Sequence, residues 1–191
     1  TIWQSQLDAV GAALERSAMT NHIPAWVDGA LTPVDKLEAH LRGLRHKAVS
    51  VFLLRGDAVL IQRRALGKYH TPGLWANTCC THPHWDESPI DCAARRLREE
   101  LGIEGVALAP RGQVEYRADV GGGMIEHELV DIFVGHAPEG LKIAPNPEEV
   151  MEIAWVPLDE LHRQTRDEAT RFTPWLRIYL EQHSKQILAE L

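Results

Sequence analysis

Two short stretches of the chain carry side chains that could do chemistry. The first, NTCCTHPHWDES at residues 77–88, places two adjacent cysteines just before His82. The second, MIEHELV at residues 124–130, places Glu126 and Glu128 two residues apart. Thiols, imidazoles and paired carboxylates are groups that transfer protons or bind metal ions. These residues can form one site only if the fold brings the two stretches together.

The two glutamates lie in a β-rich run. A strand turns alternate side chains to opposite faces, so Glu126 and Glu128 share one face and His127 lies on the other. A solvated edge strand would explain the pair without any ligand. Val130 is in phase with both glutamates, however, and indicates that their face turns inward. Buried paired carboxylates need a metal ion or a shared proton.

Histidines could complete such a metal site. His40, His46 and His82 are candidates, although sequence spacing alone does not bring them together. Three imidazoles and two carboxylates suit Mn(II), Zn(II) or Mg(II) better than a closed thiolate zinc site. A structural zinc knuckle is not expected, because the C-x-H spacing at Cys80 has no second cysteine pair to complete it.

Composition narrows the class of protein. The 191 residues, 45% of them hydrophobic, suit a single domain with its own core. Three cysteines are an odd count, and the adjacent pair cannot form an unstrained disulfide, so a reducing cytoplasm is expected. A net charge of −7 argues against nonspecific nucleic-acid binding, which usually needs a basic face. The chain has no run long enough to span a membrane and no basic start typical of a signal peptide.

Two basic clusters stand out in this acidic chain. They are QRRALGK at residues 62–68 and RRLRE at residues 95–99. Either cluster could bind a small phosphorylated ligand, or could simply be a solvated basic face.

Hydrophobic periodicity predicts the elements that must position these residues. Residues 3–17 are expected to form an N-terminal helix, which sets a helical extension (1–18) apart from a single domain (19–191). HIPAWVDGALTP at 22–33 predicts a strand, an Asp-Gly turn and a proline stop. Hairpins are expected at 48–64, turning at Gly56–Asp57, and at 113–137, turning at residues 121–123.

The clearest helix is SPIDCAARRLREELG at residues 88–102. Ser88 suits the N-cap, Pro89 the first turn, Asp91 a capping box and Gly102 the C-terminal stop. Arg96 and Glu100 share one face. The stripe predicted to face the core consists of Ile90, Ala94, Leu97 and Leu101.

Two further segments complete the prediction. Residues 148–161 predict a strand that leads into a helix, and residues 172–191 predict one C-terminal helix that begins near Pro174. Strands and helices are mixed without regular βαβ alternation, which indicates an α+β fold with a mixed sheet.

The predicted helix at 88–102 lies within a recognisable motif. ESPIDCAARRLREELGI, at residues 87–103, resembles the later part of a Nudix box, G-x5-E-x7-R-E-U-x-E-E-x-G-U with U aliphatic. Thr81 stands where the box has glycine, and Arg96 where it has the glutamate of RE. These departures point away from ordinary pyrophosphohydrolases and toward another branch of the superfamily.

From residue 22 to residue 175 the chain resembles the type I isopentenyl-diphosphate isomerases. The resemblance rests on the joint order of several segments: DKLEAHLRGLRHKAVS, RRALGKYHTPGLWANTCCTHPHWDES, the box helix, EYRAD, IEHE and FTPW. It implies a Nudix-type fold, with a mixed sheet flanked by helices and an N-terminal helical extension.

The resemblance also implies a site, residue by residue. A divalent ion, Mn(II), Zn(II) or Mg(II), would be bound by His40, His46, His82, Glu126 and Glu128. A Mg(II) ion accompanying the substrate diphosphate would be held by Glu100 and the Cys80 carbonyl. The catalytic residues would be Cys80, Glu128, Tyr116 and Trp175, the last two lining a hydrocarbon pocket. The substrate-binding residues would be Lys36, Arg64, Lys68, His82 and Arg96.

The implied reaction interconverts isopentenyl and dimethylallyl diphosphate, in isoprenoid biosynthesis, through a tertiary carbocation. The glutamate pair would supply one proton, Cys80 would exchange the other, and Trp175 would stabilise the cation. The expected partner is a prenyl diphosphate, with no nucleic acid or membrane, acting on a monomer or homodimer. A Nudix hydrolase that uses Glu99 and Glu100 as a metal pair is the alternative, and an inactive metal-binding protein is a third possibility.

Other conspicuous residues are expected to be structural. Cys79 would pack beside Cys80, and Cys92 would pack within the box helix. Surface or supporting positions are expected for His84, His127 and His136, and core or loop-anchoring positions for Trp75, Trp85 and Trp155.

Overall fold

A computed structural model describes residues 21–189 of the chain, and a mixed β-sheet dominates it. The sheet has nine strands within this range. They are β1 (His22–Val27), β2 (Ala30–Asp35), β3 (Arg45–Arg55), β4 (Ala58–Arg64), β5 (Trp75–Ala76), β6 (Cys79–Thr81), β7 (Leu108–Gly121), β8 (Met124–His136) and β9 (Val150–Pro157).

Helices flank this sheet. They are α2 (Lys36–Arg42), α3 (Pro89–Leu101), α4 (Leu158–Asp167), the short 3₁₀ helix η1 (Ala169–Arg171), α5 (Pro174–Gln182) and α6 (Ser184–Leu188). None of the helices between residues 21 and 189 combines the length and the hydropathy needed to cross a bilayer. The helix predicted at residues 3–17 lies outside the described residues, so the two-part division of the chain stays a prediction.

Strand β3 organises the sheet. One of its edges pairs in parallel with β8, from Arg45 opposite His127 to Leu54 opposite His136. The other edge pairs antiparallel with three short partners in succession: β1, β6 and the start of β4. Strand β8 also pairs antiparallel with β7, and β4 with β5 and β9. Parallel and antiparallel pairs therefore coexist, which confirms the predicted α+β class with a mixed sheet.

Both predicted hairpins are present, but the proline stop is wrong. The β3–β4 hairpin turns at Gly56–Asp57, and the β7–β8 hairpin turns at Gly122 and Gly123, whose positive φ angles of 63° and 76° favour glycine. Strand β2 continues through Pro33 to Asp35. It is the outermost strand in the order β2-β1-β3-β4-β5, and an edge strand tolerates a proline because no ladder bond is lost on the open side.

Helix α3 has the predicted ends but only part of the predicted buried face. The Ser88 hydroxyl accepts from the Asp91 N–H at 3.3 Å, and Gly102 ends the helix in the left-handed conformation. Leu97 and Leu101 are buried as expected, whereas Ile90 and Ala94 are exposed. The buried face is rotated because it includes Glu100, whose carboxylate finds hydrogen-bond partners there. The residues buried on it are Cys92, Ala93, Leu97, Glu100 and Leu101.

The C-terminal region also differs from the prediction in one detail. Strand β9 leads into α4 as predicted, but the single helix expected from Pro174 onward is two helices, α5 and α6. The break falls at His183, whose φ and ψ of −127° and 8° are not helical.

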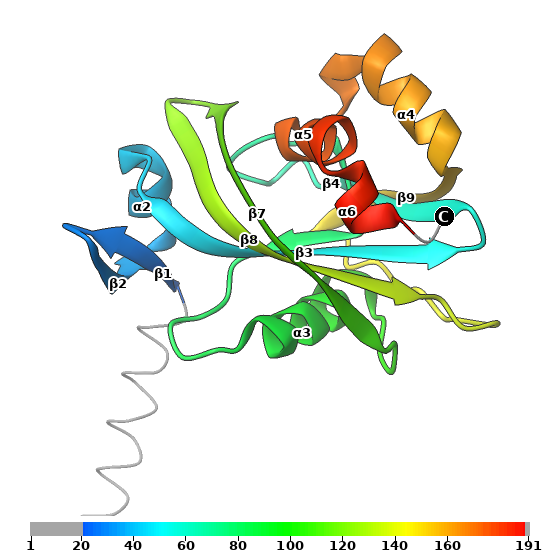
Figure 1. Cartoon of the computed structure of the whole chain (residues 1–191), viewed down its shortest axis with the longest axis horizontal. Coiled ribbons are helices and arrows are strands. Elements are labelled where there is room, and N and C mark those ends of the chain that lie inside the picture. Colours follow the sequence, from blue (N-terminus) through cyan, green and yellow to red (C-terminus); the bar gives the residue numbers. More distant parts are fainter. Residues whose placement is uncertain (1–20, 190–191) are drawn as a thin grey trace, which may run out of the picture.

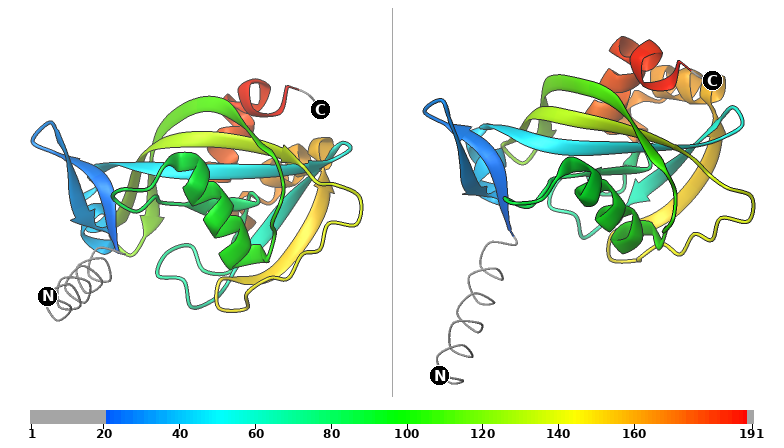
Figure 2. Two further views of the ribbon diagram at one scale, coloured as in Figure 1. Left: turned by 90° about the horizontal axis from the view of Figure 1, so that it is seen from below. Right: turned by 60° about the horizontal axis from the view of Figure 1, so that its bottom comes forward.

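The sheet separates two hydrophobic clusters. Ala48, Phe52 and Leu54 on β3 pack with residues of α5 and α6. Val49 and Val51, on the other face, pack with residues of α3. Figure 1 shows α3 below β3 and the α5–α6 pair above it, with β1, β2 and α2 gathered at one end. Both views of Figure 2 show the same arrangement of layers, so the core lies on both faces of one sheet.

Candidate active site

Most of the predicted site residues line one pocket. His40 and His46 do not line it, but both lie beside it in the histidine cluster described below. The predicted residues that line the pocket are Lys36, Arg64, Lys68, Cys80, His82, Arg96, Glu100, Tyr116, Glu126, Glu128 and Trp175. The fold therefore brings together side chains that are far apart in the sequence.

The two adjacent cysteines point to opposite faces of the sheet. Both lie on β6, where Cys79 pairs with Val51 and Cys80 with Ser50 of β3. Cys79 is fully buried in the hydrophobic cluster beside α3, whereas Cys80 lines the pocket. Cys79 therefore packs in the core as expected, and only Cys80 reaches the pocket.

Hydrogen bonds to residues that do not line the pocket hold the Cys80 thiol in place. Sγ donates to Oδ1 of Asn77 at 2.8 Å, and Nδ2 of Asn77 is fixed by two backbone carbonyls. Sγ also lies 3.1 Å from Oγ of Ser50, which lies 3.0 Å from the hydroxyl of Tyr179 on α5. Burial raises the pKa of the Cys80 thiol, and its contacts with Ser50 and Asn77 offset this only in part. Cys80 is therefore a protonated thiol at neutral pH.

Histidines and glutamates gather beside this thiol and form two overlapping groups that could hold a metal ion. Within each group, one candidate ligand atom per residue lies within 4.8 Å of the others. The groups are His40, His46, His82 and Glu128, and His40, His70 and Glu126; all six residues are buried. Five of the six are the ligands expected from the sequence.

The imidazoles of His40 and His46 suit a metal ion, because Nδ1 of each ring already has a backbone hydrogen-bond partner. Nδ1 of His40 donates to the Lys36 carbonyl at 2.6 Å, and Nδ1 of His46 donates to the Leu44 carbonyl at 2.7 Å. Nε2 of His40 then carries a lone pair and has no hydrogen-bond partner among the described residues, while Nε2 of His46 lies 3.4 Å from Oε1 of Glu128. Such backbone contacts are how proteins orient metal-binding histidines. The cluster is therefore chemically fit for a divalent ion.

The glutamate pair completes the cluster from β8. The Tyr116 hydroxyl lies 2.8 Å from Oε2 of both Glu126 and Glu128, and His82 Nε2 lies 2.9 Å from Oε1 of Glu128. Burial and the neighbouring Glu128 raise the pKa of Glu126. Burial alone would raise the pKa of Glu128 too, but its contacts with His46 and His82 hold that pKa well below the usual range. The two carboxyl groups therefore lie in different electrostatic environments, although they share the Tyr116 hydroxyl.

A second set of residues that line the pocket is cationic. Oε1 of Glu100 accepts from Arg96 at 2.5 Å, and Oε2 accepts from Gln62 at 2.8 Å. Lys68 pairs with Glu149, which also lies 3.3 Å from Arg96. Four cationic side chains at one end of a small pocket suit a diphosphate. They are Lys36, Arg64, Lys68 and Arg96.

Several residues of the pocket were missed from the sequence. His70 is buried beside Glu126, Tyr69 lines the mouth, and Ser50 and Tyr179 support the thiol. For Ser50 a signal existed, because a hydroxyl within the apolar run AVSVFLL must find a buried partner. For His70 there was none, since it lies in the loop between β4 and β5, where hydrophobic periodicity says nothing about side-chain direction.

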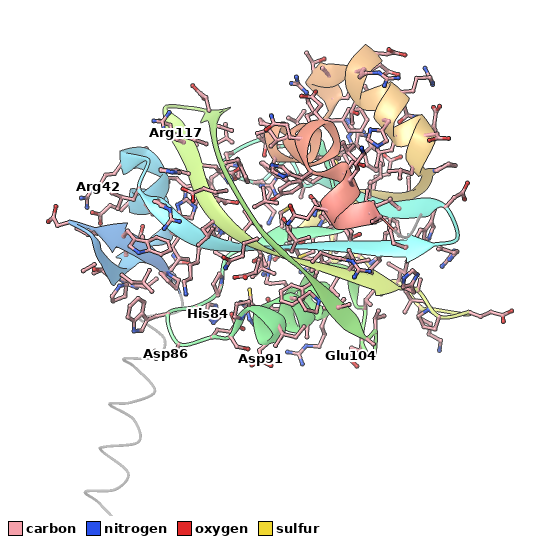
Figure 3. The ribbon with its side chains drawn as sticks, in the orientation of Figure 1. Arg42, His84, Asp86, Asp91, Glu104 and Arg117 are labelled. Atoms are coloured by element: carbon pink, nitrogen blue, oxygen red, sulfur yellow. The ribbon has the colours of Figure 1, made fainter. Side chains whose placement is uncertain are left out.

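Residues expected to be structural lie outside the site or at its margin. Cys92 and Trp75 are buried in the core, and Trp155 packs against the cluster beside α3. His84 lies on the loop that leads into α3 (Figure 3), where its backbone N–H donates to the Glu87 carboxylate. His127 is on the outer face of β8, 3.4 Å from Glu115. All of these positions agree with expectation.

Comparison with known proteins places the chain in a family. The NUDIX domain model matches residues 44–176. A protein of Dinoroseobacter shibae named isopentenyl-diphosphate Delta-isomerase is 69% identical over 169 residues, which cover 88% of this chain and 96% of that protein. A protein of Jannaschia sp. with the same name is 66% identical over 166 residues, or 87% of this chain and 94% of that protein.

Solved structures agree on the fold. A Deinococcus radiodurans protein superposes with a TM-score of 0.65 at 14% identity, over 84% of this chain and 98% of that one. A MutT NUDIX hydrolase from Burkholderia pseudomallei superposes with a TM-score of 0.57 at 23% identity, over 73% of this chain and 98% of that one. Together with the site geometry, these relationships show that the chain belongs to the NUDIX family and, within it, to the isopentenyl-diphosphate Delta-isomerases.

Proposed function

We propose that the protein interconverts isopentenyl diphosphate and dimethylallyl diphosphate. In this reaction a proton adds to the terminal carbon of the alkene, a tertiary carbocation forms, and a proton leaves the carbon two positions away. The diphosphate stays intact. The reaction needs one group that holds a proton and one that does not, both in a single pocket closed to bulk water.

The observation that carries the proposal is that the Cys80 thiol and the Glu128 carboxylate line one pocket together with four cationic side chains. Burial raises the pKa of the Cys80 thiol, and contacts with His46 and His82 hold the pKa of Glu128 low. The thiol can then give a proton to one carbon while the carboxylate takes one from the other, and the reverse reaction starts from the opposite states.

The carbocation needs stabilisation without a nucleophile. Trp175 lines the pocket and is 1% exposed, so its indole would face the cation in a dry environment. A desolvated cation over an indole face gains on the order of 2 kcal/mol, or about thirtyfold in rate if the gain is confined to the transition state. Tyr116 would support the same step by holding both glutamates in place.

The cationic end of the pocket would bind and orient the diphosphate. Lys36, Arg64, Lys68 and Arg96 would act there, with His82 beside them, and no bond to phosphorus would break. Charged hydrogen bonds of this kind fix the substrate so that its alkene lies between the thiol and the carboxylate.

Divalent ions are part of the proposal. NUDIX proteins use such ions, and we assign one, Mn(II), Zn(II) or Mg(II), to His40, His46, His82, Glu126 and Glu128. When bound, it would stabilise the charged forms of the glutamates. Glu100 and the Cys80 carbonyl would hold a Mg(II) ion that neutralises the diphosphate. A state of monomer or homodimer and a cytoplasmic location stay predictions.

A hydrolase that uses Glu99 and Glu100 as a metal pair is less well supported. The Glu100 carboxylate is buried and bonded to Gln62 and Arg96, whereas the Glu99 carboxylate is 39% exposed and pairs with Arg95 and Arg96. The two carboxylates therefore differ in burial, and the Arg96 guanidinium contacts both of them, in the place that a metal ion shared by the pair would need.

Incubation of the protein with isopentenyl diphosphate and Mg(II) in heavy water tests the proposal. Dimethylallyl diphosphate that carries deuterium and an intact diphosphate is the expected product, because solvent protons enter through exchange at the thiol and the carboxylate. Release of phosphate or pyrophosphate without isomerised product would refute the proposed function and favour hydrolysis.

A further inference from the structure

His70 is buried, lines the pocket and has no role in the function proposed above. Its side chain is 5% exposed, and its Nε2 lies 3.5 Å from Oε1 of Glu126. Its ring stacks against that of His40, with centroids 5.5 Å apart, and meets Trp175 edge-on at 6.0 Å. His70 thus touches both the metal-binding cluster and the hydrocarbon end of the pocket.

The partners of the two ring nitrogens distinguish His70 from the other histidines. In His40 and His46, Nδ1 faces a backbone carbonyl, which can only accept, so Nδ1 carries a proton and Nε2 is the atom turned toward the metal-binding cluster. In His70, Nδ1 lies 3.1 Å from the hydroxyl of Thr71, which can donate. A donating hydroxyl leaves the proton on Nε2, where it points to Glu126.

We propose that His70 is a positioning residue, whose Nε2–H donates to Oε1 of Glu126 and fixes that carboxyl group for the isomerisation. The inference rests on the proposed isomerase function. The Tyr116 hydroxyl contacts Oε2 of the same carboxyl group at 2.8 Å, so Glu126 is held at both oxygens. The His70 Nε2 atom lies 3.5 Å from the other oxygen, Oε1.

The backbone around His70 is built to hold the ring in place. Thr71 has a φ of 46°, which is costly for a β-branched residue. The His70 carbonyl accepts from Arg64 at 3.2 Å, and the Arg64 guanidinium lies 5.3 Å from the centroid of the Trp175 ring. Arg64 therefore connects His70, which contacts Glu126, to the Trp175 ring. Arg64 is also one of the cations proposed to bind the diphosphate.

Three substitutions separate the donor from the bulk of the ring. Glutamine places an N–H near the position of Nε2, asparagine places one near Nδ1, and leucine fills the space without a donor. His70→Leu is expected to lower kcat by about 10- to 100-fold, with little change in KM, as is usual when a partner of a metal-binding carboxylate is lost. His70→Gln should recover most of that loss, and His70→Asn should not.

Two further variants protect the test from a folding defect. Thr71→Val leaves the ring but removes the hydroxyl that sets its tautomer, so kcat should fall in the same direction by a smaller factor. His127→Gln, on the outer face of the same strand as Glu126, is the matched control and should keep wild-type kcat. Thermal melting by circular dichroism checks that each variant is folded.

The visible spectrum of the Co(II)-loaded protein distinguishes positioning from metal binding. If His70 only positions Glu126, His70→Gln keeps the wild-type spectrum; if His70 is a metal ligand, the bands change in all three variants, and the proposal is overturned. Equal kcat values for His70→Gln and His70→Leu would overturn it as well. A wild-type protein that does not isomerise would refute the proposed function itself, whereas an active wild type with unaffected His70 variants would refute only the inference.

Discussion

The two ends of the pocket are built in different ways. The reaction end, which we define as Cys80, Glu128, Tyr116 and Trp175, comes from strands β6, β7 and β8 and from α5. Its members are fixed by neighbours such as Ser50, Asn77 and His82. The anion end, which we define as Lys36, Arg64, Lys68 and Arg96, comes mostly from helices and the loop after β4.

The difference lies in what each end does before substrate arrives. The reaction end is held by uncharged donors and packed rings, so its geometry is already set. At the anion end, Lys68 and Arg96 are paired with carboxylates that a diphosphate must displace or share. A preorganised end should act on the transition state, and an end that exchanges partners should act on binding. Changes at the first should lower kcat, and changes at the second should raise KM.

The largest effect is expected at the two adjacent cysteines, which separate reaction from packing. Cys80→Ala should abolish measurable turnover, since a positioned acid–base group contributes about 10²- to 10⁴-fold. Cys79→Ala should keep most of the turnover and cost about 1 kcal/mol of unfolding free energy, because it only removes a buried sulfur from the core. Steady-state kinetics and chemical denaturation measure the two effects.

Binding provides the control for this pair of variants. Cys80→Ala should still bind dimethylallyl diphosphate in calorimetry, because the anion end is untouched. Equal losses of turnover in Cys79→Ala and Cys80→Ala would contradict the assignment of the two faces.

Trp175 tests whether the aromatic ring at the reaction end acts on the carbocation. Nε1 of Trp175 has no hydrogen-bond partner among the residues that the structure describes, so Trp175→Phe removes indole surface without breaking a hydrogen bond. We expect kcat to fall by up to about thirtyfold, the worth of a strong cation–π contact, with KM little changed. A rise in KM at constant kcat would show that the ring serves binding alone.

Trp75 offers a matched control. It is buried in the same core cluster as Trp175 but does not line the pocket. Trp75→Phe should therefore lower the melting temperature without a comparable loss of kcat.

Local signals in the sequence predicted most of the fold. The Gly-Asp and triple-glycine turns set both hairpins, and Ser88, Pro89 and Gly102 set the ends of α3, because turns and caps depend on residues close in sequence. The errors arose where distant contacts decide. Pro33 lies within a strand because that strand is an edge, and Ile90 is exposed because the buried face of α3 is turned toward Glu100.

The candidate site shows the same division between features set by local sequence signals and features set by distant contacts. The alternation of side chains on a strand predicted that Glu126 and Glu128 share a face, and the motif resemblance supplied the remaining positions. Neither signal could reveal that Tyr179, 129 positions away in the sequence, contacts the Ser50 hydroxyl that supports the Cys80 thiol. Neither could reveal the contact of His70 with Glu126. Such contacts depend on how β3 and α5 pack and on how one loop folds back, which no local pattern encodes.

The smallest effect is expected at the anion end, and it depends on pH. Burial, together with nearby arginines, lowers the pKa of Lys36 and of Lys68 from 10.5 to about 8. The charged form that binds a diphosphate is therefore complete well below pH 8 and is lost as the pH rises through that value. We expect kcat/KM to fall above pH 8, by up to about tenfold per pH unit for each group that titrates, while kcat changes less because bound diphosphate keeps the lysines protonated.

Lys68→Arg turns this expectation into a comparison between the two ends. A guanidinium keeps its charge at every accessible pH, so the variant should shift the fall in kcat/KM to higher pH and leave the shape of the kcat profile unchanged. If kcat fell in parallel with kcat/KM in the wild type, the titrating group would belong to the reaction end instead. The pH profile thus shows, without any change at Cys80 or Glu128, whether binding and reaction are separated along the length of the pocket.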